Sequence, residues 1–135
     1  MIYTTYFAKL NKLPENVVPI SICGKAPDWY KGLQYKKLAP KYDFFMKWKE
    51  THDNDYYIQC FNEQVLNNLS SEKVLEELYD KVNLEYINSG ISFSALPCVD
   101  IALVCYEKPS DFCHRHLVAD WLNNNGYECK EFEYK

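Results

Sequence analysis

The chain has 135 residues, of which 47% are hydrophobic and 25% are charged, the composition of a soluble globular protein. That length predicts a single domain over residues 1–135, built around one core. The net charge of −4 argues against extended nucleic-acid binding, which needs a basic stripe, and no apolar run approaches the roughly 18 residues of a membrane span.

The N-terminal part of the chain predicts two strands and a long loop. Residues 2–8 are β-branched and aromatic, and residues 17–23 form a second such run that Gly24 ends. Residues 27–40 follow as a long irregular stretch. A loop of that length in a compact domain is often functional.

Three helices are predicted in the middle of the chain. The first covers residues 41–51, and Asp55 is expected to cap the second, whose apolar residues recur at helical spacing. Ser70 or Ser71 is expected to cap the third. Residues 83–98 fit no single element, although Asn-Ser-Gly at residues 88–90 indicates a turn.

The C-terminal part predicts a strand, a helix and a strand. Residues 99–106 are apolar at their centre, as in a strand buried on both faces of a parallel sheet. Ser110 or Asp111 is expected to cap a helix that runs to about residue 124, and residues 127–134 alternate as an edge strand. The whole pattern predicts a small Rossmann-like three-layer α/β domain, with a mostly parallel sheet of about four to five strands and helices on both faces.

The cysteines predict a reducing compartment. The first 22 residues lack the apolar core of a signal peptide, so the protein is expected in the cytoplasm, where its six cysteines stay thiols. Cys23, Cys60 and Cys105 lie in apolar stretches, where a cysteine behaves as a small hydrophobic residue.

The break between the last buried strand and its helix is predicted to carry the functional site. Ligands bind at the carboxyl ends of strands in such sheets, which puts Cys105 and Glu107 at the rim. Cys113, His114 and Arg115 fall in the first turn of the helix, where free N–H groups attract anions and lower thiol pKa values.

The first function that fits is an enzyme acting on a nucleotide or another phosphorylated small molecule. Arg115 would bind phosphate through two parallel hydrogen bonds, with help from His114. Glu107 would be the general acid/base or the nucleophile. Cys105 and Cys113 would form a wall of the site or supply an activated thiol.

The second function is a non-catalytic protein that binds a nucleotide or a nucleotide signal in the same pocket. In either case Tyr6, Trp29 or Tyr30 would stack on a base. The expected partner is therefore one small phosphorylated molecule, and the sequence leaves the oligomeric state open.

Arg115 also has a structural interpretation. It can pair with Glu107 or Asp111 and lock the loop without binding a ligand. A cysteine-phosphatase loop does not fit, because Arg115 lies ten positions after Cys105 and acidic residues lie between them.

The third function is a zinc-stabilised interaction module. Cys105, Cys113 and His114 would supply three ligands, with Cys98 or His116 as the fourth. Adjacent Cys113 and His114 would need an unusual local geometry, and paired C-x₂₋₄-C spacing is absent. No metal cofactor is therefore predicted, and zinc is kept as the alternative.

The motif also has a family resemblance. Two short segments resemble the hallmark of the domain-of-unknown-function 488 family. They are Cys-Tyr-Glu-Lys-Pro at residues 105–109 and Cys-His-Arg-His-Leu-Val-Ala at residues 113–119. Residues 5–8, 21–22 and 38–40 are also similar to that family. The resemblance implies a compact α/β domain with this Cys-Glu and Cys-His-Arg cluster as its signature, and it implies no activity.

Overall fold

The computed structural model describes residues 1–90 and 99–135, and its strands form one parallel sheet. Within these residues the sheet has five strands in the order β3–β2–β4–β1–β5. The strands are β1 (Ile2–Tyr6), β2 (Val17–Ser21), β3 (Leu33–Gln34), β4 (Asp100–Cys105) and β5 (Cys129–Glu131).

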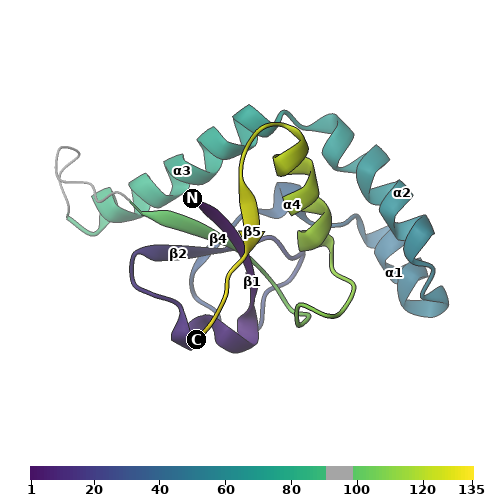
Figure 1. Cartoon of the computed structure of the whole chain (residues 1–135), viewed down its shortest axis with the longest axis horizontal. Helices are drawn as coiled ribbons and strands as arrows, with labels where there is room; N and C mark the ends of the chain where they lie inside the picture. Colours follow the sequence, from purple (N-terminus) through teal and green to yellow (C-terminus); the bar gives the residue numbers. More distant parts are fainter. Residues whose placement is uncertain (91–98) are drawn as a thin grey trace.

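Helices cover the sheet. Figure 1 shows the α-helices arching over the sheet on one side, with the 3-10 helix η1 on the side away from that arch. None of the helices in the described ranges is long and apolar enough to cross a membrane. The α-helices are α1 (Tyr42–Thr51), α2 (Asn54–Gln64), α3 (Ser71–Asn88) and α4 (His114–Asn124), and the 3-10 helices are η1 (Phe7–Lys12), η2 (Lys36–Leu38) and η3 (Leu66–Asn68).

The predicted small three-layer α/β domain with a parallel sheet is confirmed. Strand β4 is the centre of the sheet, and Ile101 through Val104 are 0% exposed because both faces of the strand are covered. Strand β5 pairs with β1 alone, which makes it the predicted edge strand.

The register brings the carboxyl ends of three strands together. Tyr6 of β1 pairs with Cys105 of β4, and Ser21 of β2 pairs with Val104. These ends meet at one edge of the sheet, which is where parallel α/β proteins bind ligands. The residues that follow β2 and β4 therefore lie side by side.

Two helix starts differ from the prediction. Asp53 caps α2, because its side chain accepts a hydrogen bond from the Tyr56 backbone N–H, and Asp55 lies one residue inside the helix. Cys113 precedes α4 in place of the predicted caps, Ser110 or Asp111. A hydrogen bond from the Asp111 N–H to the Lys108 carbonyl places Asp111 in a turn before the helix.

The remaining boundaries are close to those predicted. Ser70 caps α3, as expected, and α3 runs on to Asn88 before Gly90, whose φ of +92° suits a glycine. The first strand ends at Tyr6, where η1 begins, and β5 is shorter than the alternating pattern indicated. Part of the ambiguous stretch and Cys98 lie outside the described residues.

Candidate metal centre

Two thiols and an imidazole converge at the end of β4. Cys105 is the last residue of β4, Cys113 precedes α4, and His114 is the first residue of that helix. One ligand atom from each lies within 4.8 Å of the other two, and all three residues are buried. The cluster therefore consists of two sulfur atoms and one nitrogen atom with little access to water.

The backbone at Cys113 explains how two adjacent residues join one cluster. Cys113 is extended, with φ −156° and ψ 142°, while His114 already has helical geometry. The change of backbone conformation between them turns consecutive side chains toward the same point. This is the unusual local geometry that the zinc alternative needed.

A backbone carbonyl orients the imidazole of His114. Its Nε2 lies 2.8 Å from the carbonyl oxygen of Ile22, and because that oxygen only accepts, Nε2 carries the proton. The second nitrogen, Nδ1, lies 3.3 Å from the sulfur of Cys105, and Nε2 lies 3.5 Å from the same sulfur. Imidazoles that bind metals have this arrangement, with the second nitrogen donating to a carbonyl or carboxylate.

Cys113 is the more acidic of the two thiols. Burial opposes its ionisation, but hydrogen bonds from Cys105 and His114 and the nearby Arg115 backbone N–H lower its pKa below the ordinary value. Burial raises the pKa of Cys105 well above the ordinary value. The cluster thus stabilises one thiolate next to one protonated thiol.

Glu107 lies at the edge of the cluster. Burial raises the pKa of Glu107 to about 7, together with the negative charge of the neighbouring Cys113 thiolate, to which the carboxyl group is hydrogen-bonded. Its side chain is half-buried, unlike the fully covered cysteines. The structure therefore brings together four of the predicted site residues: Cys105, Glu107, Cys113 and His114.

Cys23 is a member of the cluster that the sequence did not reveal. Its sulfur lies 3.6 Å from that of Cys105, and it is 5% exposed. The sequence prediction treated Cys23 as a core residue. Only the pairing of β2 with β4 brings it to the site, and no local signal in the sequence indicates which strands are neighbours.

Arg115 is engaged in a buried ion pair. Its side chain is 0% exposed, and its Nε and Nη2 donate to the two carboxylate oxygens of Glu131 at 3.0 and 3.1 Å. Nη1 donates to the backbone carbonyl of Glu107 at 2.6 Å. The loop lock that the sequence suggested therefore has Glu131 as its carboxylate, not Glu107 or Asp111.

This pairing bears on the predicted phosphate site. A carboxylate already occupies the bidentate face of the Arg115 guanidinium, and Thr4 donates to the same carboxylate at 2.6 Å. Binding of phosphate by Arg115 stays a prediction, and it would require Glu131 to be displaced.

The three predicted stacking residues are not gathered at one place. The ring of Tyr6 lies 5.7 Å from Cζ of Arg115. Trp29 and Tyr30 instead pack edge-on against Phe7, with ring centroids 6.0 and 5.3 Å away. Trp29 is 61% exposed, whereas Tyr30 is buried and donates to the backbone through its hydroxyl.

The sequence offered Cys98 or His116 as the fourth zinc ligand, and neither is among the converging residues that the structure describes. Cys98 lies outside the described residues. His116 is one helical position past Arg115, and its buried Nε2 has no hydrogen-bond partner among the residues that the structure describes. The group of converging ligand atoms consists of Cys105, Cys113 and His114.

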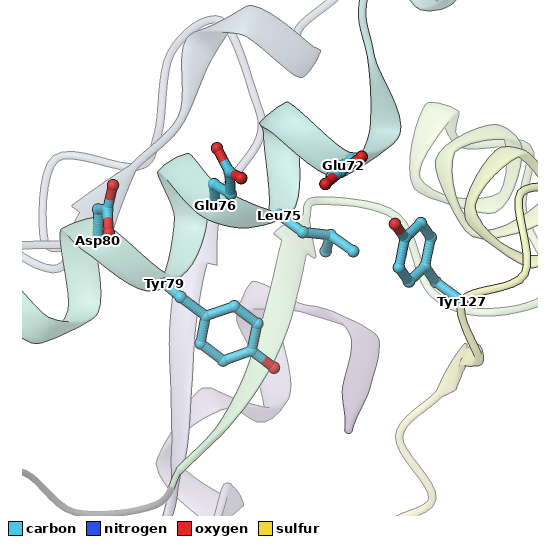
Figure 2. Close-up of a pocket in the computed structure, with 6 residues that line it drawn as sticks. All are labelled: Glu72, Leu75, Glu76, Tyr79, Asp80 and Tyr127. Carbon is cyan, nitrogen blue, oxygen red and sulfur yellow. The ribbon is translucent and has the colours of Figure 1, made fainter.

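A surface hollow of about 520 Å³ lies elsewhere, along α3. Figure 2 shows Leu75 and Tyr127 facing one another across it, with three carboxylates on the helix beside them. None of the predicted site residues is among the described residues that line it. The hollow is therefore separate from the thiol cluster.

Comparisons with family models, curated proteins and solved structures found no significant match to this chain. The resemblance to the domain-of-unknown-function 488 family stays a prediction. The chemistry of the cluster of Cys105, Cys113 and His114 is what bears on function.

Proposed function

We propose that the protein binds one zinc-class metal ion through Cys105, Cys113 and His114. The observation that carries the proposal is the convergence of their ligand atoms within 4.8 Å in a buried position. The hydrogen bond from His114 Nε2 to the Ile22 carbonyl supports it further, because it leaves Nδ1 free to coordinate.

The spacing of the ligand atoms suits a small tetrahedral ion. Zinc binds sulfur at about 2.3 Å and imidazole nitrogen at about 2.0 Å, so its ligand atoms are spaced about 3.5 to 3.8 Å apart. The 3.3 Å between the Cys105 sulfur and His114 Nδ1 is close to that spacing. All three ligand atoms lie within 4.8 Å of one another, so binding would draw the remaining pairs together by no more than about 1 Å.

The donor types favour a soft or borderline metal. Thiolate and imidazole select zinc, copper(I) or iron over magnesium and calcium, which prefer oxygen ligands. Two thiolates also balance the charge of a divalent ion. A neutral centre is far less costly to bury than separate charges.

Three protein ligands leave a fourth coordination position, as in catalytic zinc sites. The Glu107 carboxyl group is half-buried and hydrogen-bonded to Cys113, so it lies beside this centre. The enzyme predicted from the sequence would then use the metal for its chemistry on a small molecule. A phosphorylated substrate stays a prediction.

Cobalt(II) titration of the reduced, untagged protein tests the proposal. A tetrahedral thiolate site is expected to give intense visible bands and a sulfur-to-cobalt band that saturate at one ion per chain. Cys113→Ser and His114→Ala should each weaken binding by at least roughly 100-fold, because each removes a ligand.

Cys129→Ser is the matched control, since it removes a buried thiol on β5 outside the cluster and should leave the bands unchanged. Circular dichroism would check that each variant is folded. Wild-type protein without these bands, or bands that persist in His114→Ala, would refute the metal site.

A further inference from the structure

We infer that Cys23 is the redox partner of Cys105: oxidation joins the two sulfurs in a disulfide and releases the metal ion. This inference rests on the proposed metal site and names how that site is regulated. It assigns a role to Cys23, whose thiol belongs to the cluster but is not a proposed ligand.

The two thiols are already in contact. Their sulfur atoms are 3.6 Å apart, and the Cys23 sulfur also lies 3.7 Å from the Val104 carbonyl oxygen. The bond from Ile22 N–H to that same carbonyl, at 3.1 Å, extends the pairing of β2 and β4 beyond Ser21. The two backbones therefore run side by side up to the cysteines.

A disulfide between them needs side-chain rotation more than backbone movement. The sulfur atoms must approach from 3.6 Å to the S–S distance of about 2.05 Å. Neighbouring strand ends hold the two residues at short range. The pair is thus prepared for bond formation in the folded protein.

Burial selects the oxidant. Cys23 is 5% exposed and Cys105 is 1% exposed, so a bulky disulfide reagent has poor access. Hydrogen peroxide is close to water in size, so it is the class of oxidant that can reach these buried sulfur atoms. Cys23 is not one of the three converging ligand residues, so its sulfur is not needed to hold the metal.

The reaction proceeds in two steps. Cys105 would be a thiolate when it holds the metal; its sulfur attacks one peroxide oxygen, the O–O bond breaks, hydroxide leaves, and Cys105 becomes a sulfenic acid. The Cys23 sulfur then attacks the Cys105 sulfur, the S–O bond breaks, and the oxygen leaves as water with the Cys23 proton. The two sulfurs together lose two electrons, and peroxide gains them.

Metal release follows from the change at Cys105. A disulfide sulfur has no negative charge and is a poor ligand, so the centre keeps only Cys113 and His114. A thiol reductant reverses the reaction by restoring both thiols. Zinc affinity is thereby coupled to the redox state of Cys23.

The test uses the full-length, zinc-loaded protein treated with hydrogen peroxide. A chromogenic indicator measures released zinc, and alkylation followed by peptide mass spectrometry maps the disulfide. We expect one zinc ion released per Cys23–Cys105 disulfide, with zinc taken up again after reduction. This mapping needs no variant and so does not depend on a variant that folds.

Variants test the role of Cys23 directly. Cys23→Ser and Cys23→Ala should still bind zinc when reduced, but in excess peroxide their Cys105 should be oxidised on to the sulfinic acid, so that at least roughly tenfold less zinc is taken up again after thiol reduction. Cys60→Ser, which removes a buried thiol on α2, should behave as the wild type.

The outcomes separate the two proposals. Recovery of zinc binding by Cys23→Ser to the wild-type extent after peroxide and reduction, or a disulfide from Cys105 to Cys113, would overturn the redox role and leave the metal site standing. Reduced wild-type protein that binds no zinc would overturn the metal site, and with it the coupling, whatever disulfide forms.

Discussion

Arg115 positions the start of α4 and the loop before it. Its guanidinium joins α4 to β5 through Glu131 and holds the loop after β4 through the Glu107 carbonyl. Cys113 and His114 directly precede it in the chain. The buried ion pair therefore fixes the helix start that brings these two side chains to the cluster.

Removing the carboxylate partner of Arg115 should lower the free energy of unfolding. Glu131→Ala leaves a buried guanidinium without its carboxylate, and we expect a loss of roughly 3 kcal/mol in the free energy of unfolding. That value is at the low end for buried pairs, since the Glu131 side chain keeps 25% exposure. Urea denaturation measures it.

Glu133→Ala is the control for this prediction, because Glu133 is exposed and two residues further along the chain. It should change the unfolding free energy by less than about 0.5 kcal/mol. Equal effects of the two substitutions would show that the ion pair has no special part in stability.

At the residue scale, the sequence predicted what is local and missed what depends on strand order. Cys105, Cys113 and His114 were found because a strand end and the next helix start are close in sequence. Cys23 and Glu131 were missed because they reach the site through the neighbours of β4 and β1 in the sheet. Which strands pair is a long-range property that a single sequence does not express.

At the element scale, helix starts depend on the side chain that reaches the free N–H groups. Asp53, and not the predicted Asp55, accepts from the Tyr56 N–H at 3.1 Å. The two aspartates are close enough in sequence that apolar periodicity does not separate them. At α4, Cys113 takes the position before the helix although it makes no side-chain cap hydrogen bond.

The α2 cap gives a matched pair of substitutions. Asp53→Ala should lower the unfolding free energy by about 1 kcal/mol, because it leaves a helix N–H unsatisfied. Asp55→Ala removes the same charge from the first turn without removing the cap, and should cost no more than about 0.5 kcal/mol. Thermal or urea unfolding distinguishes them, and a larger loss in Asp55→Ala would contradict the assignment.

At the scale of the whole molecule, the parallel α/β fold was predictable from the succession of strands and helices and from the apolar centre of one strand. The apolar centre of β4 indicated a strand covered on both faces, and Ile101 through Val104 are buried as that requires. The order of the strands and the two-residue β3 were not predicted. β3 is too short to stand out from the irregular stretch around it.

Metal binding should also be visible in global stability. A ligand that binds only the folded state, and is present at a free concentration of 100 times its Kd, stabilises a protein by about 2.7 kcal/mol. For a chain of this length, zinc is then expected to raise the Tm by roughly 5 to 10 °C. A calorimetric scan with and without zinc measures the shift, and the same scan on His114→Ala should show little change.

Native mass spectrometry of the reduced, untagged protein shows whether Cys105, Cys113 and His114 bind a metal ion. We predict a wild-type chain that carries one zinc ion, and His114→Ala and Cys113→Ser chains that carry none under the same conditions. A wild-type chain that stays metal-free in the presence of excess zinc, or a His114→Ala chain that retains the ion, would contradict this prediction.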